Sequence, residues 1–284
     1  MNERERRVGQ VKEITSLANP IIKDIRALAL KKFRDRDGVF MAEGLKLVLD
    51  ALDAGWAIRT LVMTKAGKGN ALVEKAAARA VAAGGLVIET SDKVMGAITR
   101  RDNPQTVLGV FAQKTTPLET IRPKGEEVWI ALDRVRDPGN LGTIIRTADA
   151  VGAAGIVLVG ETTDPFSLEA VRATMGSLFS VPIARAGQQA FLKWAAGAGA
   201  LVVGTHLEGA VDYRTVAYAG RPVVLLMGNE QQGLAADLVP ACSALVRIPQ
   251  AGRADSLNLA VATAVMLYEI RRDALTLESQ TPPA

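Results

Sequence analysis

The feature that most constrains this chain is a series of short, continuous apolar runs in its second half. They lie at residues 128–132, 156–159, 201–203, 223–227 and 244–248. None alternates apolar with polar residues, which is typical of strands buried on both faces of a sheet. Helical stretches separate most of the runs, so the sequence predicts an α/β fold with a parallel sheet covered by helices. Ligands of such sheets lie beyond the carboxyl ends of the strands, and the residues that follow each run are therefore the candidates for chemistry.

The first half predicts a smaller alternating α/β unit. Helices are expected over 20–29, over 45–52, from the Asn70 cap to 84–85 and from the Ser91 cap to 98, with strands at 60–64, 86–88 and 107–111. Two prolines and few apolar residues mark a linker. The predicted organisation is a charged tail over 1–13, a small domain over 14–112, the linker over 113–126 and a second domain over 127–284.

Charge is distributed unevenly along the chain. Residues 1–125 carry 22 Lys and Arg against 14 Asp and Glu, whereas residues 126–284 carry 12 against 16. The helix predicted over 20–29 and the residues just after it place cations opposite an apolar stripe: Lys23, Arg26, Lys31, Lys32 and Arg34. Two interpretations are open, a solvated helix face or a surface that contacts the phosphates of a nucleic acid.

Several classes of chemistry lack the residues that they need. Cys242 and His206 are the only residues of their kinds, so neither an internal disulfide nor a protein-bound metal is expected. No dinucleotide-binding glycine pattern and no phosphate-binding loop motif occurs. Cys242 is predicted to lie within a helix, which argues against a cysteine nucleophile. The charged start is followed by no apolar segment and no run spans a bilayer, so we expect a cytoplasmic protein.

Polar residues follow the first apolar run of the second half. Pro138-Gly139 forms a turn, Asn140 is a candidate helix cap, and Thr143 and Thr147 share a helix face with Asn140. Arg146 lies one step from that face, between isoleucines and alanine. A guanidinium in such surroundings needs an anion, which makes Arg146 a candidate for function.

Two further polar segments follow the fourth and fifth apolar runs. Gly228 to Leu234 holds an acid and three amides between two glycines, which suits a loop that passes close to a ligand. After Pro249, a polar loop leads to a helix that Asp255 or Ser256 could cap. Asn258 is expected inside the first turn of that helix, where its side chain would need polar partners.

Taken together, these three segments resemble the three sequence motifs of the SpoU family of SPOUT RNA methyltransferases. The segments are Asp137–Asp149, Met227–Leu234 and Ile248–Ala262. The first domain, with Asn19-Pro20-Ile-Ile-Lys and Met41-Ala-Glu-Gly44, also resembles the RNA-binding domain of many members, which is similar to kink-turn-binding ribosomal proteins. The resemblance implies transfer of a methyl group from S-adenosylmethionine to an RNA ribose 2′-hydroxyl. It further implies a C-terminal trefoil knot and a homodimer formed through the second domain.

The resemblance also implies roles for individual residues. The cofactor site would be lined by Gly228, Ile248, Leu257, Thr205, Met227, Pro249 and Leu259. The functional polar residues would be Arg146, Asn140, Glu230, Ser256 and Asn258. One departure is visible, because Gln250 stands where many members have Met.

Methyl transfer to a ribose hydroxyl requires positioning and stabilisation of developing negative charge. A guanidinium is essentially always protonated, so we expect Arg146 to grip a phosphate and stabilise the alkoxide rather than to act as a base. Ribosomal RNA is favoured over transfer RNA as the substrate, because a separate basic domain suits a large structured RNA. The alternatives are a transfer RNA methyltransferase, a non-catalytic RNA-binding or ribosome-assembly protein, and an enzyme that methylates a base nitrogen.

Overall fold

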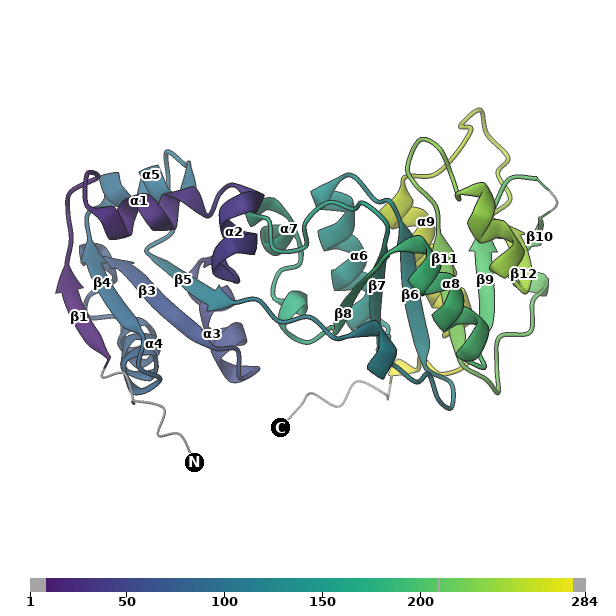
Figure 1. The fold of residues 1–284 in the computed structure, drawn as a ribbon, viewed down its shortest axis with the longest axis horizontal. Coiled ribbons are helices and arrows are strands. Elements are labelled where there is room, and N and C mark those ends of the chain that lie inside the picture. The colour runs from purple at the N-terminus through teal and green to yellow at the C-terminus, as the bar shows by residue number, and fades with distance from the viewer. Residues whose placement is uncertain (1–8, 209, 278–284) are drawn as a thin grey trace. The chain divides into compact units, whose positions relative to one another are not determined.

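The computed structural model describes residues 9–208 and 210–277. The chain divides into two compact units (Figure 1). The first contains the chain up to Lys114 together with Asp164–Phe179, and the second contains Thr115–Thr163 together with the chain from Ser180 on. No helix within the described ranges combines the length and apolar character needed to cross a membrane.

The first unit is a mixed sheet with helices packed against it. Its elements are β1 (Gln10–Glu13), α1 (Pro20–Ala27), α2 (Lys31–Asp37), β2 (Val39–Glu43), α3 (Leu45–Asp53), β3 (Ile58–Thr64), α4 (Ala71–Ala82), β4 (Leu86–Thr90), α5 (Asp92–Thr99), β5 (Val107–Ala112) and α7 (Leu168–Ala173), with a short 3-10 turn, η1, at Lys65–Gly67. The strand order is β1-β4-β3-β5-β2 within the described residues. Strand β5 pairs antiparallel with β3 and β2, and the remaining pairs are parallel.

Capping residues and apolar patterns in the sequence predicted most of these helices and strands correctly. Asn19, Asn70 and Ser91 each cap a helix by accepting backbone N–H groups, as predicted for the latter two. Two predictions were wrong. Residues 10–13 of the predicted tail form strand β1, which pairs with β4. The helix predicted over 20–29 ends at Ala27, and a second helix starts at Lys31.

A segment from the middle of the chain belongs to the first unit. Residues 164–179 leave the second unit after β7 and pack α7 against β2. The Phe166 ring lies 4.9 Å from the Phe40 ring, centroid to centroid. Arg34 forms a buried ion pair with Asp164 at 2.8 Å, and Arg172 pairs with the buried carboxylate of Glu43. Apolar contacts and two ion pairs therefore complete the first unit with a segment that sequence patterns had not assigned to it.

The second unit contains the predicted parallel sheet. Its elements are η2 (Leu118–Thr120), β6 (Val128–Asp133), α6 (Pro138–Ala150), β7 (Gly155–Val159), β8 (Ile183–Ala186), α8 (Gln188–Gly197), β9 (Leu201–Thr205), β10 (Val211–Asp212), η4 (Tyr213–Thr215), β11 (Val223–Met227), η5 (Ala236–Ala241), β12 (Ala244–Arg247) and α9 (Leu259–Ile270). The remaining 3-10 turn, η3 (Ser177–Phe179), belongs to the first unit. The strand order is β10-β12-β9-β11-β6-β7-β8 among the described residues, and every pair is parallel. All five predicted strands are confirmed, and β8 and β10 are additional.

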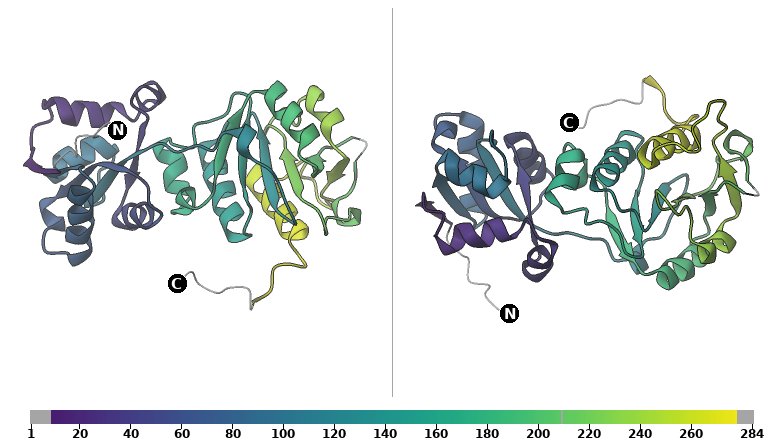
Figure 2. Two further views of the ribbon diagram at one scale, coloured as in Figure 1. Left: turned by 60° about the horizontal axis from the view of Figure 1, so that its bottom comes forward. Right: turned by 90° about the horizontal axis from the view of Figure 1, so that it is seen from above.

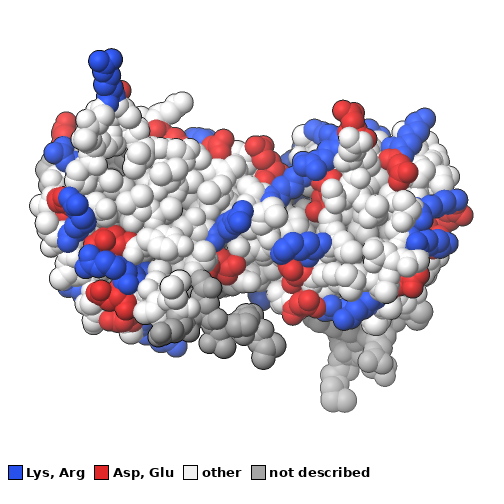
Figure 3. Space-filling model, turned by 180° about the vertical axis from the view of Figure 1, so that it is seen from behind, with Lys and Arg blue, Asp and Glu red and all other residues white. Residues whose placement is uncertain are grey.

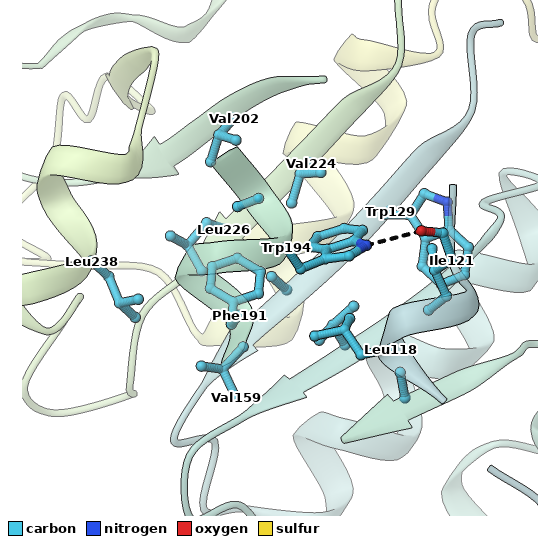
Figure 4. Close-up of a cluster of buried hydrophobic side chains, with 14 of the residues drawn as sticks. Leu118, Ile121, Trp129, Val159, Phe191, Trp194, Val202, Val224, Leu226 and Leu238 are labelled. Carbon is cyan, nitrogen blue, oxygen red and sulfur yellow. Dashed lines mark hydrogen bonds between the residues drawn. The ribbon is translucent and has the colours of Figure 1, made fainter. Parts of the chain in front are cut away.

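Helices cover both faces of this sheet. Helices α6 and α9 pack together on one face, and α8 with η5 covers the other (Figure 2). Under α8, Phe191 and Trp194 fill an apolar core with strand residues such as Val224, and the Trp194 indole N–H donates to the carbonyl of Ile121 at 3.1 Å (Figure 4). Leu118 of the predicted linker is also buried in this core. Ile121 is buried there too, so the segment 113–126 is anchored in the core of the second unit at two residues.

The strand order places two loops side by side. Strands β6 and β11 are hydrogen-bonded neighbours, although residues 134–222 lie between them in the chain. From β6 the chain proceeds to β7 and β8 on one side, while β11 and β9 lie on the other. The loops after β6 and β11 consequently meet where the strand order reverses, which is the usual location of a ligand site in a parallel sheet.

Candidate active site

A cavity of about 960 Å³ opens at the carboxyl ends of β9, β11 and β12. Its size is typical of a small-molecule site. Each residue predicted to line the cofactor site lines this cavity. These residues are Thr205, Met227, Gly228, Ile248, Pro249, Leu257 and Leu259. The structure thus gathers residues from three separate loops into one hollow, which we call the cofactor cavity.

Gly228 is required by close backbone packing in the wall of this cavity. A Cβ atom at this position would lie 2.3 Å from the carbonyl carbon of Gly233 and 2.3 Å from the nitrogen of Leu234. Asn229 and Gly233 exchange two backbone hydrogen bonds, at 2.9 and 3.0 Å, which close the loop tightly. No larger residue fits at Gly228 without moving this loop, so the shape of this part of the cavity wall depends on a glycine at position 228.

Three of the predicted polar residues form one hydrogen-bonded chain. The Asn258 Nδ2 donates to Asn140 Oδ1 at 2.9 Å, and the Asn140 Nδ2 donates to Glu230 Oε1 at 3.3 Å. We call this the Asn258–Asn140–Glu230 chain. It joins the start of α9, the first turn of α6 and the loop after β11. All three residues also line the cofactor cavity.

The Glu230 carboxylate accepts hydrogen bonds from the loop between β6 and α6. It accepts the backbone N–H of Arg136 at 3.2 Å and that of Asp137 at 3.2 Å, in addition to the Asn140 amide. A carboxylate that accepts from three donors fixes the geometry of those donors. Glu230 is thus a positioning residue in this arrangement.

Two helix caps differ from the prediction. Asn258 is the cap of α9, and its Oδ1 accepts the N–H groups of Ala260 and Val261, whereas it was expected inside the helix. Asp137 caps α6 by accepting the N–H of Asn140, which had been the candidate cap. Asp255 and Ser256 precede the helix without capping it. Asn258 therefore has both a structural partner and a partner in the polar chain.

Ser256 and Arg146 do not join this chain. Ser256 lines the cofactor cavity but makes no hydrogen bond to any described residue. Arg146 is exposed on α6, outside the cavity, and its guanidinium has no partner among residues 9–208 and 210–277. The predicted polar residues therefore converge in part, and Arg146 is not aimed at the cofactor cavity of its own chain.

Known proteins of one family match this architecture. The SpoU rRNA methylase family model matches residues 127–268, and the model of the MRM3-like substrate binding domain matches residues 19–109. This chain belongs to the SpoU family. The predicted RNA methyltransferase activity and the predicted cofactor, S-adenosylmethionine, are confirmed at the level of this family.

Individual SpoU relatives cover almost the whole chain. A 23S rRNA (guanosine(2553)-2′-O)-methyltransferase of Bacillus subtilis is 31% identical, over 92% of this chain and 100% of its own length. A 23S rRNA (uridine(2479)-2′-O)-methyltransferase of Streptomyces viridochromogenes is 32% identical over 88% of both chains. The AdoMet-bound crystal structure of an rRNA methyltransferase from Sinorhizobium meliloti is 64% identical, with a TM-score of 0.90, and covers 94% of this chain and 100% of that one.

The two lone reactive side chains of this SpoU protein do not form a second centre. His206 lines the cofactor cavity, and its ring Nδ1 lies 2.8 Å from the carbonyl oxygen of Glu208. Burial raises the pKa of Cys242 to about 11, so its thiol stays protonated and unreactive near neutral pH. Cys242 follows η5 directly and does not lie mid-helix as predicted.

The cations predicted to contact RNA differ in their availability. Lys23 and Arg26 are exposed on α1, Lys31 pairs with Asp35 at 2.6 Å, and Lys32 lies over the Phe33 ring at 4.8 Å. Arg34 is 4% exposed, and its guanidinium donates hydrogen bonds to the Asp164 carboxylate and to the carbonyl of Leu28. Arg34 was predicted to contact RNA, but in this structure it is a buried structural residue, because the segment 164–179 covers it.

Charges on the rear face of the molecule are mixed. Figure 3 shows Lys and Arg side chains next to Asp and Glu side chains on that face, without one large patch of a single sign. The first unit also contains ion pairs of Lys68 with Glu89 and of Lys65 with Glu13, each at 2.8 Å. The basic excess of the first half is therefore partly neutralised by local pairing.

The sequence analysis did not name Arg134 or Arg136, and it included Asn229 only as one of the amides of the loop from Gly228 to Leu234. All three line a second pocket of about 500 Å³ that shares Asn140, Glu230 and Asn258 with the cofactor cavity. The position of Arg134 and Arg136 in the sequence could have identified them, because both lie just after the carboxyl end of β6, where ligands of a parallel sheet bind.

Proposed function

We propose that this chain transfers the methyl group of S-adenosylmethionine to the ribose 2′-hydroxyl of a structured ribosomal RNA. The observation that carries the proposal is the position of the Asn258–Asn140–Glu230 chain, which lines both the cofactor cavity and the second pocket. A methyl donor in one hollow and a ribose in the other would meet at these amides. The 23S rRNA 2′-O-methyltransferases among the relatives support the choice of ribosomal over transfer RNA.

The cofactor cavity has the features that S-adenosylmethionine requires. Apolar side chains such as Ile248 and Leu257 would contact the adenine, and the backbone of the loop that begins at Gly228 would offer hydrogen-bonding groups to its polar edge. When bound, the cofactor supplies a methyl group on a positively charged sulfur. These residues would hold and orient it and would exclude water from the reacting atoms.

The polar chain would act by orientation and by hydrogen-bond donation. Asn140 and Asn258 each direct one amide N–H along the chain, and each retains a second N–H for a substrate oxygen. Fixed donors of this kind stabilise negative charge that develops on the ribose oxygen. Glu230 would hold these amides in place, and Ser256 would help to hold the adjoining loop.

A homodimer formed through the second unit would account for two exposed features. Val261 and Tyr268 lie two turns apart on one face of α9 and are 50% and 55% exposed. Arg146 lies on α6, which packs against α9, and it has no partner in the described chain. We infer that the dimer covers this apolar face and brings Arg146 to the phosphate or ribose bound by the partner subunit.

The remaining expectations belong to the same proposal. The first unit would bind RNA through exposed cations including Lys23, Arg26, Lys31 and Lys32. The segments around Met227–Leu234 and Ile248–Ala262 would form the trefoil knot that the family resemblance implies. A protein that modifies ribosomal RNA must meet it where ribosomes are assembled, so we place the chain in the cytoplasm.

Two measurements test the proposed function. Calorimetry should detect binding of S-adenosylmethionine to the purified protein, and its absence would favour a non-catalytic RNA-binding or ribosome-assembly protein. Mapping ribose methylation across total RNA from strains with and without the gene should show one ribosomal RNA position that loses its methyl group. Loss at a transfer RNA position would instead establish a transfer RNA methyltransferase.

A further inference from the structure

The second pocket adjoins the cofactor cavity but differs from it in chemistry. It has a volume of about 500 Å³ and is lined by polar and charged residues, including Arg134 and Arg136. Glu230, Asn140 and Asn258 line both hollows. A ligand in the second pocket would therefore contact the same three side chains as a ligand in the cofactor cavity.

Three of the four charged side chains that line this pocket already have partners. The Arg134 guanidinium pairs with Asp133 through Nε and Nη2 at 2.9 Å each, and its Nη1 donates to Gln232 at 2.7 Å. The Asp137 carboxylate accepts the N–H of Asn140 at 2.6 Å. The Glu230 carboxylate accepts two backbone N–H groups and the Asn140 amide. These three charges are committed to holding the walls of the pocket.

Arg136 is the exception among these four. Its guanidinium has no hydrogen bond or ion pair with any residue in the described parts of the chain. Its backbone is nevertheless fixed, because its own N–H donates to Glu230 at 3.2 Å. The preceding loop is also fixed, since the Asn229 Nδ2 donates to the carbonyl of Arg134 at 2.8 Å. A free cation is thus anchored at the rim of a polar pocket beside the proposed methyl donor.

We propose that Arg136 binds the phosphate next to the ribose that is methylated, and so sets the position of the acceptor nucleotide. A guanidinium matches the geometry of two phosphate oxygens, and it remains charged throughout the pH range of the reaction. Arg136 would thus hold this phosphate from within its own chain, in addition to the role proposed for Arg146 across the dimer interface. This inference rests on the proposed function, because it assigns the substrate subsite of that reaction.

The test compares Arg136→Ala and Arg136→Lys with the matched control Arg221→Ala. Arg221 is an exposed arginine of the same unit that lines neither pocket, and its described hydrogen bond is a long one of 3.4 Å to the carbonyl of Ala217. For each protein, kcat and KM for ribosomal RNA are measured between 50 and roughly 200 mM salt. The affinity for S-adenosylmethionine is measured separately by calorimetry, and folding by thermal unfolding.

Arg136→Ala should raise KM for RNA by about tenfold or more, and the slope of log KM against log salt should fall by roughly 0.7 to 0.9 for the lost phosphate contact. For Arg136→Lys, KM should lie between the values of the wild type and of Arg136→Ala, and the salt slope should stay close to that of the wild type. Lysine keeps the positive charge but cannot contact two phosphate oxygens with a planar guanidinium. Arg221→Ala should match the wild type. Cofactor affinity and the unfolding temperature should be unchanged in every variant.

Two results would overturn the assignment. One is an unchanged KM and salt slope in Arg136→Ala. The other is a weakened affinity for S-adenosylmethionine with normal use of RNA, which would place Arg136 against the carboxylate of the cofactor. Failure of the proposed function is distinguishable from both, because the wild-type protein itself would then transfer no methyl group to RNA.

Discussion

Asn258 donates a hydrogen bond of 2.9 Å to Asn140 across 118 residues of sequence. The orientation of both amides follows from their neighbours. The Asn258 oxygen accepts two backbone N–H groups at the start of α9, which leaves its NH2 group for Asn140. The Asn140 oxygen must then accept, and its own NH2 group faces the Glu230 carboxylate. A helix cap thus determines the direction of the two amide donors of the Asn258–Asn140–Glu230 chain.

The Asn258→Asp substitution keeps the side-chain oxygen that caps α9 but removes the Nδ2 group that donates to Asn140. Aspartate caps helices as well as asparagine does, so the free energy of unfolding should stay within about 0.5 kcal/mol of the wild type. The carboxylate cannot donate to Asn140, and methyl transfer should fall by about a hundredfold, as for loss of a single fixed donor. Asn258→Ala removes both functions and should cost about 1 kcal/mol of stability in addition. Urea unfolding and single-turnover methyl transfer measure the two effects, and full activity of Asn258→Asp would contradict the role of the chain.

Gly228→Ala should abolish binding of S-adenosylmethionine. The added Cβ would come within 2.3 Å of the backbone at Gly233 and Leu234, so the loop that walls the cofactor cavity must move. Gly197→Ala is the matched control, because a Cβ there meets nothing within 4 Å. Calorimetry should show at least about tenfold weaker binding for the first variant and normal binding for the second, since a displaced wall loses contacts that define the pocket. Equal affinities would show that the cofactor binds elsewhere.

Arg146 should act across the proposed dimer interface. Alone, Arg146→Ala and Asn258→Asp should each be nearly inactive. Co-expressed subunits of the two variants would form mixed dimers in which one site has both an intact Arg146 and an intact Asn258. Random pairing should restore roughly a quarter of the wild-type activity. No recovery in isolated mixed dimers would place Arg146 in the site of its own chain, and full activity of Arg146→Ala would remove it from the mechanism.

Arg34→Met should destabilise the first unit strongly. The substitution leaves the buried carboxylate of Asp164, whose side chain is 4% exposed, without its guanidinium partner. Breaking a buried ion pair in this way costs about 3 to 5 kcal/mol of unfolding free energy. Lys31→Ala breaks an exposed pair with Asp35, of which the side chains are 53% and 43% exposed, and should cost less than about 0.5 kcal/mol. Similar urea midpoints for the two variants would contradict the structural role of Arg34.

The Cys242 thiol should react slowly in the folded protein. Burial raises its pKa from 9.0 to about 11, so the thiolate is roughly a hundredfold scarcer at pH 8 than for an unburied thiol. Alkylation by iodoacetamide at pH 8 should therefore be much faster in urea than in buffer, and it should accelerate in buffer as the pH rises toward 11. Cys242→Ala should transfer methyl groups normally. Loss of activity in that variant would instead support a cysteine nucleophile acting on a pyrimidine base.

The parallel sheet and the location of the site could be predicted because both depend on local patterns. Continuous apolar runs gave the strands, and the rule that ligands lie beyond their carboxyl ends indicated the loops of Asn140, Glu230 and Asn258. The sequence could not show which residue caps α9, because Asp255, Ser256 and Asn258 are all competent caps and tertiary contacts decide between them. Only the structure shows that Asn258 bonds to Asn140.

The residues that sequence reasoning misjudged are those whose environment comes from distant parts of the chain. Arg34 has the periodicity of an exposed helix residue, but it is 4% exposed and forms an ion pair with Asp164, which lies 130 residues later in the chain. Arg134 and Arg136 both follow β6 in the sequence, yet only the Arg134 guanidinium donates hydrogen bonds to Asp133 and Gln232. Charge and spacing identify candidates, and burial and pairing then determine which of them are available.

The most direct test of the central claim is the chemical position of the transferred methyl group. Ribosomal RNA is incubated with the protein and methyl-labelled S-adenosylmethionine, digested to nucleosides and separated by chromatography with mass detection. We predict that the label appears in a 2′-O-methylated nucleoside, and that Asn258→Asp reduces it by about a hundredfold. Label on a base nitrogen, or no transfer by a protein that binds the cofactor, would contradict the account.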